Sequence, residues 1–225
     1  MKQEHEKLVI WGESLSENDL ARIAEMKSLR EIVLGEMKIG DGIFECLRQL
    51  EHLECLNLAY TDVSRGFGEL TRLPLREVLL EGCSRIGDDA MRELAECSKL
   101  RHVEAHMTTV TDIGVVSILR LPLEVLWLGP RITDRSLEAM AGVPTLRHLD
   151  LCARGITDIG VRNLARLPNL QILWLSQTAI TDASVDTLAG MGSLRELAVG
   201  GTRMTPEGKA RLAAALPQCR FAPEP

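Results

Sequence analysis

The chain has 225 residues, of which 45% are hydrophobic, and its formal net charge at pH 7 is −6. This apolar content is sufficient for a sizeable core. The acidic balance argues against a general nucleic-acid-binding protein, whose surface would be basic. Apolar runs fall well short of the roughly 18 residues that a membrane-spanning helix needs, and residues 1–14 lack the apolar segment of a secretory signal. We therefore expect a cytoplasmic protein that binds neither nucleic acid nor membrane.

The cysteines support the same expectation. They are scattered singly, without the CxxC spacing of a zinc or redox motif, at positions 46, 55, 83, 97, 152 and 219. A disulfide framework is typical of secreted chains. We expect reduced, partly buried thiols and no disulfide.

A repeat runs along the whole sequence. Frames that begin at Leu29 and Leu194 lie seven repeats apart, so the period is about 24 residues, within the range of leucine-rich repeats. The repeats begin, in chain order, at residues 5, 29, 53, 75, 100, 123, 146, 170 and 194. This frame predicts one domain over 1–225 with about nine repeats, in which 205–225 form a C-terminal capping segment.

Each repeat predicts a strand, a turn and a helix. In "LRHLDLCARGITDIGVRNLARLPN" (146–169), Leu149 and Leu151 alternate on an LxxLxL strand. Thr157 then caps a helix on which Val161 and Leu164 share one face. The same "TD" cap recurs at 111, 133 and 181, and "TPEG" (205–208) starts the last helix. The predicted fold is an α/β solenoid, a right-handed superhelix with a parallel sheet on its concave face and helices on its convex face.

The repeats resemble those of a known family. "CSRIGDDAMRELAEC" (83–97) matches C-x-x-I-[TG]-D-x-x-[LM]-x-x-L-x-x-C, the pattern of the cysteine-containing leucine-rich repeat proteins. "LPQCRF" (216–221) is similar to the end of bacterial proteins with "ITDxG" repeats. Eukaryotic members are often substrate receptors of ubiquitin ligases, which carry an F-box ahead of the repeats. Here the repeats begin at once, so the resemblance gives little support to that role.

The residues that face away from the core are the third, fifth and seventh of each repeat. All three tryptophans fall on these positions. Trp127 and Trp174 share one column two strands apart, with Asp150 between them, so we expect a shallow apolar trough with an acidic centre. Such a trough suits a basic side chain of a protein or peptide partner. The expected partner-binding residues are Trp127, Trp174, Asp150, His102, Glu104, His106, Val125, His148, Ile172 and Trp11.

Three alternatives remain for these residues. The two tryptophans could stack on each other and only stiffen the sheet. His102, Glu104 and His106, at every second position of a predicted strand, could hold a metal. His106 could also act as the base for Cys152 across Gly129. We expect none of the chemical roles, because His102 and His106 would lie about 13 Å apart along a strand and no oxyanion hole is evident.

The sequence thus predicts a non-enzymatic protein-interaction module without metal or cofactor. Two other functions stay open: a substrate-receptor or effector-type subunit that works through an adaptor, and a metal-binding or hydrolytic protein that uses the concave His, Glu, Asp and Cys rows.

Overall fold

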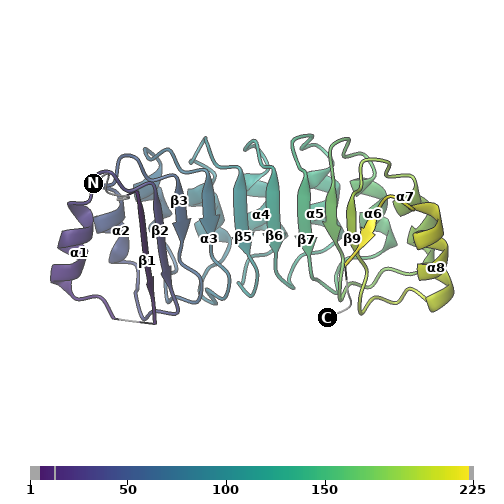
Figure 1. The fold of residues 1–225 in the computed structure, drawn as a ribbon, viewed down its shortest axis with the longest axis horizontal. Coiled ribbons are helices and arrows are strands. Elements are labelled where there is room, and N and C mark those ends of the chain that lie inside the picture. The colour runs from purple at the N-terminus through teal and green to yellow at the C-terminus, as the bar shows by residue number, and fades with distance from the viewer. Residues whose placement is uncertain (1–5, 13, 223–225) are drawn as a thin grey trace.

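A computed structural model of the chain describes residues 6–12 and 14–222 as one solenoid. Its strands form a single sheet in which each strand pairs in parallel with the next in sequence (Figure 1). The described strands are β1 (Lys7–Trp11), β2 (Glu31–Gly35), β3 (Cys55–Asn57), β4 (Glu77–Leu79), β5 (His102–Ala105), β6 (Val125–Leu128), β7 (His148–Leu151), β8 (Ile172–Trp174), β9 (Glu196–Ala198) and β10 (Arg220–Phe221).

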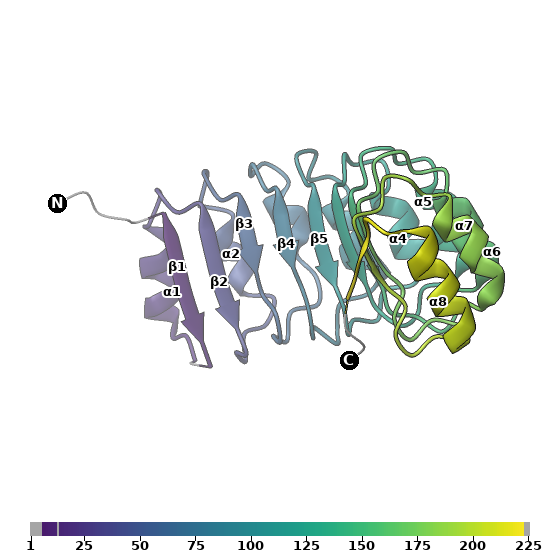
Figure 2. The same cartoon turned by 45° about the vertical axis from the view of Figure 1, so that its right-hand side comes forward.

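Helices cover the other face of the sheet, as the turned view in Figure 2 shows. They are α1 (Glu17–Ala24), α2 (Ile43–Leu47), α3 (Asp88–Leu94), α4 (Asp112–Ile118), α5 (Asp134–Met140), α6 (Asp158–Leu164), α7 (Val185–Ala189) and α8 (Pro206–Ala215). The 3₁₀ segments are η1 (Phe67–Leu70) and η2 (Asp182–Ser184). The predicted solenoid with strands on one face and helices on the other is confirmed. Within the described residues, no helix is long and apolar enough to cross a membrane.

The third repeat departs from the prediction of a helix in every repeat. It contains only the short η1, which follows Gly66 in the left-handed region at φ 110°. Glycine disfavours helix, and a second one, Gly68, lies inside this turn. Phe67 fills the space instead, edge-to-face with Phe44 at 4.7 Å between ring centroids.

The core is a continuous stack of aliphatic side chains. Leu126, Leu149 and Leu173 occupy matching positions on β6, β7 and β8, and each is fully buried. On the helical side, Val161 and Leu164 are buried as predicted. The alternation of buried and half-buried residues along each strand leaves every second side chain on the concave face.

One contact joins consecutive repeats behind the sheet. Thr157 caps α6, because its hydroxyl oxygen accepts a hydrogen bond from the backbone N–H of Ile159. The same threonine donates its hydroxyl and its backbone N–H to the two carboxylate oxygens of Asp134, one repeat earlier, at 2.6 and 2.8 Å. The threonine of each pair therefore caps its own helix, and the aspartate after it binds the capping threonine of the next repeat. The same link recurs at Asp88–Thr111, Asp112–Thr133, Asp158–Thr181 and Asp182–Thr205.

The position three residues after each capping threonine must be small. A Cβ on Gly160 would lie 2.3 Å from Oδ1 of Asp134, and one on Gly114 would lie 2.5 Å from Oδ1 of Asp88. In other repeats a serine takes this place, and Ser184 donates its hydroxyl to Oδ1 of Asp158 at 2.5 Å. The link between repeats thus explains the alternation of "TDxG" and "TDxS" in the sequence.

These hydrogen bonds also determine the ionisation of the linking carboxylates. Burial alone would raise the pKa of Asp158, but the hydrogen bonds from Ser184 and Thr181 outweigh it and hold the pKa below its usual value. The pKa of Asp112 is lowered in the same way. A carboxyl whose folded pKa is depressed stabilises the fold above its unfolded pKa, near about 3.9, and this contribution is lost as the pH falls through the folded value.

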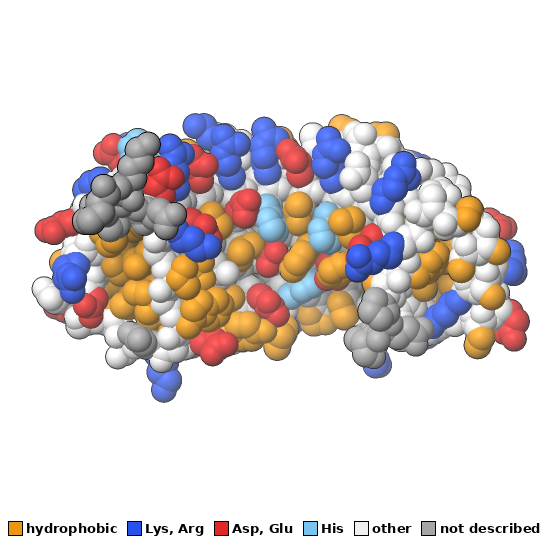
Figure 3. Space-filling view, viewed as in Figure 1, with side chains coloured by type: hydrophobic (Ala, Val, Ile, Leu, Met, Phe, Trp, Pro, Cys, Tyr) orange, Lys and Arg blue, Asp and Glu red, His pale blue; other side chains and the backbone are white. Residues whose placement is uncertain are grey.

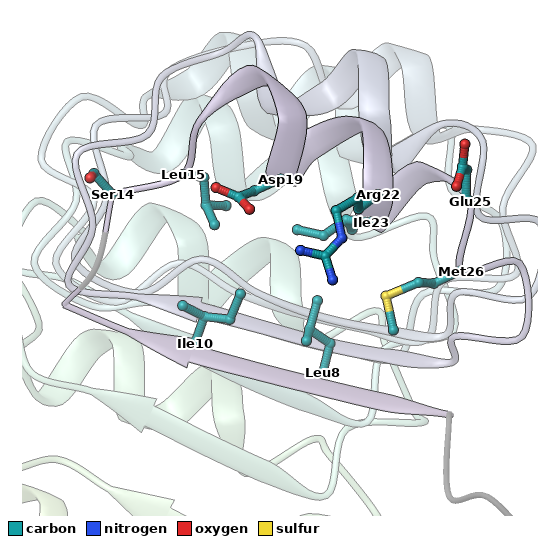
Figure 4. A pocket seen from close by; sticks show the side chains of 9 residues that line it. All are labelled: Leu8, Ile10, Ser14, Leu15, Asp19, Arg22, Ile23, Glu25 and Met26. Atoms are coloured by element: carbon teal, nitrogen blue, oxygen red, sulfur yellow. The ribbon is translucent and has the colours of Figure 1, made fainter.

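The two ends of the core differ. At the N-terminal end, Leu8, Ile10, Leu15 and Met26 are only partly buried and line a hollow between β1 and α1 (Figure 4). At the other end, α8 begins at Thr205 and Pro206 as predicted. After α8 the chain adds β10 to the sheet as a tenth described strand, beyond the nine repeats of the sequence frame. His5 and residues 223–225, which the predicted frame and capping segment include, lie outside the described residues.

Gly160→Ala tests the link between repeats. We expect this change to lower the free energy of unfolding by about 1–3 kcal/mol, because the new methyl group clashes with a carboxylate that Thr157 holds in place. Chemical denaturation measures the effect. Gly192→Ala is the matched control, since a Cβ there meets nothing within 4 Å. Equal stability of the two variants would show that the carboxylate is free to move and does not hold the repeats together.

Candidate functional site

The predicted site residues form two rows across the middle of the concave face. Strand register places one row as His102, Val125, His148 and Ile172, on β5 to β8. The second row is Glu104, Trp127, Asp150 and Trp174 on the same strands. All eight side chains are half-buried. Figure 3 shows histidine, acidic and hydrophobic side chains gathered at the centre of this face.

His106 is not on the strand that the alternating pattern predicted. β5 ends at Ala105, and His106 begins a turn in which Met107 has a φ of 54°. All three side chains lie on the predicted face, but only His102 and Glu104 belong to the strand, and His106 lies just beyond its end. The turn brings the imidazole of His106 back over the sheet, where it stacks on Trp127 with ring centroids 5.8 Å apart.

Trp127 is the centre of an aromatic cluster. Its ring centroid lies 6.0 Å from Trp174, 5.3 Å from His148 and 6.1 Å from His102. The two rings lean together at an interplanar angle of 34°, so Trp127 and Trp174 do not form opposite walls of the expected trough. The alternative arrangement, in which the two rings contact each other, is the one that the structure has. We call Trp127, Trp174, His102, His106 and His148 the aromatic cluster.

Carboxylates surround the aromatic cluster. The indole N–H of Trp174 donates to Oε1 of Glu196 at 3.0 Å. Nε2 of His102 lies 2.8 Å from Oε1 of Glu104. Nε2 of His106 lies 3.5 Å from Oδ2 of Asp150, an ion-pair distance when the imidazole is protonated. The acidic side chains are thus tied to the aromatic ones.

Nε1 of Trp127 and Nε2 of His148 are buried without a hydrogen-bond partner among the described residues, and Nε2 of His106 has only its longer contact with Asp150. The described residues hold no other such side-chain atoms. An unpaired buried polar atom costs about 1–3 kcal/mol. Its persistence in a native protein calls for an explanation, and the aromatic cluster holds two such atoms side by side on neighbouring strands.

The two histidines beside Trp127 differ in protonation. Burial disfavours the charged imidazolium of His106, but Asp150, together with Glu81 and Glu104, raises its pKa above the ordinary value. Burial lowers the pKa of His148, and Asp150 only partly offsets this effect. His106 therefore gains its proton at a higher pH than His148 does.

A hollow of about 700 Å³ opens beside the aromatic cluster. Its floor is apolar or small, with Trp174, Gly129, Pro130 and Ala198, and carboxylates stand around it. The full lining is Glu81, His106, Met107, Gly129, Pro130, Asp150, Cys152, Trp174, Ser176, Glu196, Ala198, Arg220 and Ala222. The expected site includes three of these residues, His106, Asp150 and Trp174.

Most of the other lining residues had a signal in the sequence, since six of them stand at third, fifth or seventh positions of their repeats. The repeat frame did not indicate the remaining four lining residues, which are Met107, Pro130, Arg220 and Ala222. Met107 enters through its left-handed turn. Arg220 and Ala222 enter because β10 extends the sheet.

Trp11 lies apart from the other expected site residues. It is on β1, where it pairs with Gly35 of β2. A Cβ on Gly35 would lie 2.0 Å from the Trp11 ring, so the indole lies flat over this glycine. Trp11 thus covers the sheet near its N-terminal edge, five strands away from β6.

The chemical alternatives find little support in the geometry. Within the described residues, no group of three or more His, Cys, Asp or Glu side chains converges to hold a metal ion. His102 and His106 engage different carboxylates, Glu104 and Asp150. Burial, followed by the charge of Asp150, raises the pKa of Cys152, which disfavours the thiolate that a nucleophile needs.

The fold and the repeat pattern define a leucine-rich repeat solenoid, a class whose curved sheets form extended binding surfaces. The family model described as "Leucine rich repeat" matches residues 144–204. Residues 144–204 thus carry leucine-rich repeats of this family, and the rest of the described chain has the same repeat fold, as the resemblance of its repeats implied.

Known proteins support this class through their structures. No curated protein matches the chain in sequence. Internalin C2 from Listeria monocytogenes has a similar structure, with a TM-score of 0.65 and 22% identity over 89% of this chain and 80% of that chain. Another internalin of the same organism has a TM-score of 0.52 and 17% identity over 97% and 82% of the two chains. At these identities the similarity shows the fold alone.

The opposite pKa shifts of His106 and His148 can be measured directly. In an NMR titration of the histidine side chains, we expect His106 to titrate above about 6.5 and His148 below it. Asp150→Asn should lower the pKa of His106, because it removes the facing carboxylate charge. A pKa of His148 at or above that of His106 would contradict the geometry of the cluster.

Proposed function

We propose that the protein is a non-enzymatic interaction module that binds a protein or peptide on its concave face, over β5 to β9. The observation that carries this proposal is the hollow beside the aromatic cluster. It combines an apolar floor with the half-buried Trp174, and it opens beside the cluster that holds the unpaired polar atoms of Trp127 and His148. Central aromatic residues in partly desolvated surroundings are the usual energetic centres of protein interfaces.

The charge of the surface favours a basic partner. Glu81, Asp150 and Glu196 line the hollow, whereas its cationic groups are Arg220 and, when protonated, His106. Complementary charge speeds association and selects partners. A lysine or arginine of the partner would place its apolar stem on the floor and its charge among these carboxylates.

Four other arginines are paired with carboxylates that do not line the hollow. Arg101 and Arg147 both contact Glu124, with Nη1 of Arg101 at 2.7 Å and Nε of Arg147 at 4.0 Å. Arg30 and Arg76 share Glu54 in the same way. Figure 3 shows basic side chains along the upper edge of the concave face, above its acidic centre. These four arginines therefore leave the carboxylates of the hollow to Arg220 and to a basic partner.

A second candidate function is that of a subunit working through an adaptor, and one observation favours it. Ile113 of α4 and Ile159 of α6 expose 60% and 59% of their surface on the helical side. These two isoleucines give the competing proposal a defined surface, so variants there separate the two functions.

A reducing compartment is also part of the proposal. All six cysteines are free thiols, and four of them are buried, Cys46, Cys83, Cys97 and Cys219. Burial raises the pKa of each of these four thiols. Such thiols need no disulfide for their structural role, which fits a cytoplasmic protein.

Peptide selection tests the proposed binding surface. A library of random peptides displayed on phage is selected on the intact protein, and the affinity of the selected peptides is measured by calorimetry. We expect basic sequences, and a loss of about 30-fold or more with Trp174→Ala, because central aromatic anchors are typically worth about 2 kcal/mol or more. Trp11→Ala is the matched control on the same sheet, far from the cluster.

Stability has to be compared alongside binding. Each variant is denatured chemically, and only those with near-parent stability are used. Peptides that bind the Trp174→Ala variant like the parent but lose affinity on Ile113→Asp or Ile159→Asp would contradict the concave site and favour the adaptor-type surface.

A further inference from the structure

One cation of the chain already reaches the concave hollow. Arg220 begins β10, and its Nε lies 3.6 Å from Oε2 of Glu196. The other oxygen of Glu196 accepts the indole N–H of Trp174 at 3.0 Å. A guanidinium, a carboxylate and an indole therefore form one chain of contacts at the edge of the hollow.

The side chain of Arg220 is exposed to solvent, whereas that of its partner Glu196 is largely covered. The Arg220 side chain is 73% exposed and that of Glu196 is 18% exposed. An ion pair with such an exposed member contributes little to stability, about 0–1 kcal/mol. Glu196 is kept in position by Trp174 whether or not the guanidinium is present. The carboxylate is thus a fixed acceptor, and Arg220 is a replaceable donor.

The strand that carries Arg220 has a short attachment. β10 consists of Arg220 and Phe221. The backbone N–H of Arg220 donates to the carbonyl of Arg195, just before β9, at 2.8 Å, and that of Ala222 donates to the carbonyl of Leu197 in β9 at 3.0 Å. These backbone bonds hold the strand without the guanidinium, so the side chain can swing away while the sheet stays intact.

We propose that the concave hollow binds an arginine side chain of the partner, and that the guanidinium of Arg220 occupies part of this place in the free protein. The inference rests on the proposed function and names its ligand. A guanidinium suits this place better than an ammonium, since its planar group can stack on an indole while its N–H groups bond to a carboxylate. Glu81 and Asp150 line the same hollow and add to the attraction.

The proposal predicts competition between Arg220 and added arginine. The probe is N-acetyl-arginine-N-methylamide, followed through the indole N–H signals of the three tryptophans in ¹H–¹⁵N spectra, which Trp→Phe variants assign. We expect the Trp174 signal to shift saturably and that of Trp11 to stay in place. Arg220→Gln should lower the dissociation constant about two- to fivefold, the range that an exposed ion pair is worth.

Two controls test whether the effects come from the guanidinium groups of Arg220 and of the probe. Arg211→Gln changes the same charge in the same C-terminal part of the chain, but Arg211 contacts Asp186 on the helical side, so affinity should equal that of the parent. The citrulline analogue of the probe has the same shape without the charge and should leave the Trp174 signal unshifted. The proposal is overturned if citrulline shifts Trp174 like arginine, if Trp11 shifts as much as Trp174, or if Arg220→Gln binds no more tightly than Arg211→Gln.

The experiments distinguish a failure of the proposed concave binding site from a failure of the proposed role of Arg220. If selected peptides depend on Trp174 but bind equally well to the parent and to Arg220→Gln, the concave binding site stands and the role of Arg220 is contradicted.

Discussion

A single carboxylate between repeats is the contact on which the rest of the structure depends. The aspartate after each capping threonine accepts both hydrogen bonds from the threonine of the next repeat, as Asp134 does from Thr157. The pair sets the position of one helix relative to the next, and the leucine stack behind the sheet sets the strands. Because the link needs a small residue two positions after the aspartate, it also explains Gly160 and Ser184. The same stabilising contacts thus recur from repeat to repeat. The amino acids on the concave face take no part in these contacts, so they can differ between repeats.

The concave rows follow from that regularity. With each strand in parallel register with the next, side chains from different repeats stand in columns about 4.8 Å apart, close enough for Trp127 to contact rings from three neighbouring repeats. The contacts tie acidic groups to aromatic ones, as Glu196 is tied to Trp174 and Asp150 to His106. In the proposed function, a basic side chain of the partner would meet carboxylates that are already oriented, which would reduce the ordering that binding requires.

Much of this fold could be predicted from the sequence, and the site only in part. The 24-residue period places Leu149 in the core and Trp127 on the concave face, because backbone alternation alone decides both. Ring orientation depends on rotamers and neighbours, so the contact between Trp127 and Trp174 did not follow from their spacing. His106 leaves the strand because Met107 adopts φ 54°, a conformation uncommon for a residue other than glycine. Arg220 lies beyond the last full repeat, where the periodic pattern predicts nothing.

The central claim is that the concave face between β5 and β9 is the working surface of the protein. A crystal structure of the protein with a selected peptide tests this claim most directly. The account predicts electron density for the peptide along the concave face, with an arginine in the hollow against Trp174 and Glu196. Density on the helical side, over Ile113 and Ile159, with the aromatic cluster unchanged, would contradict it.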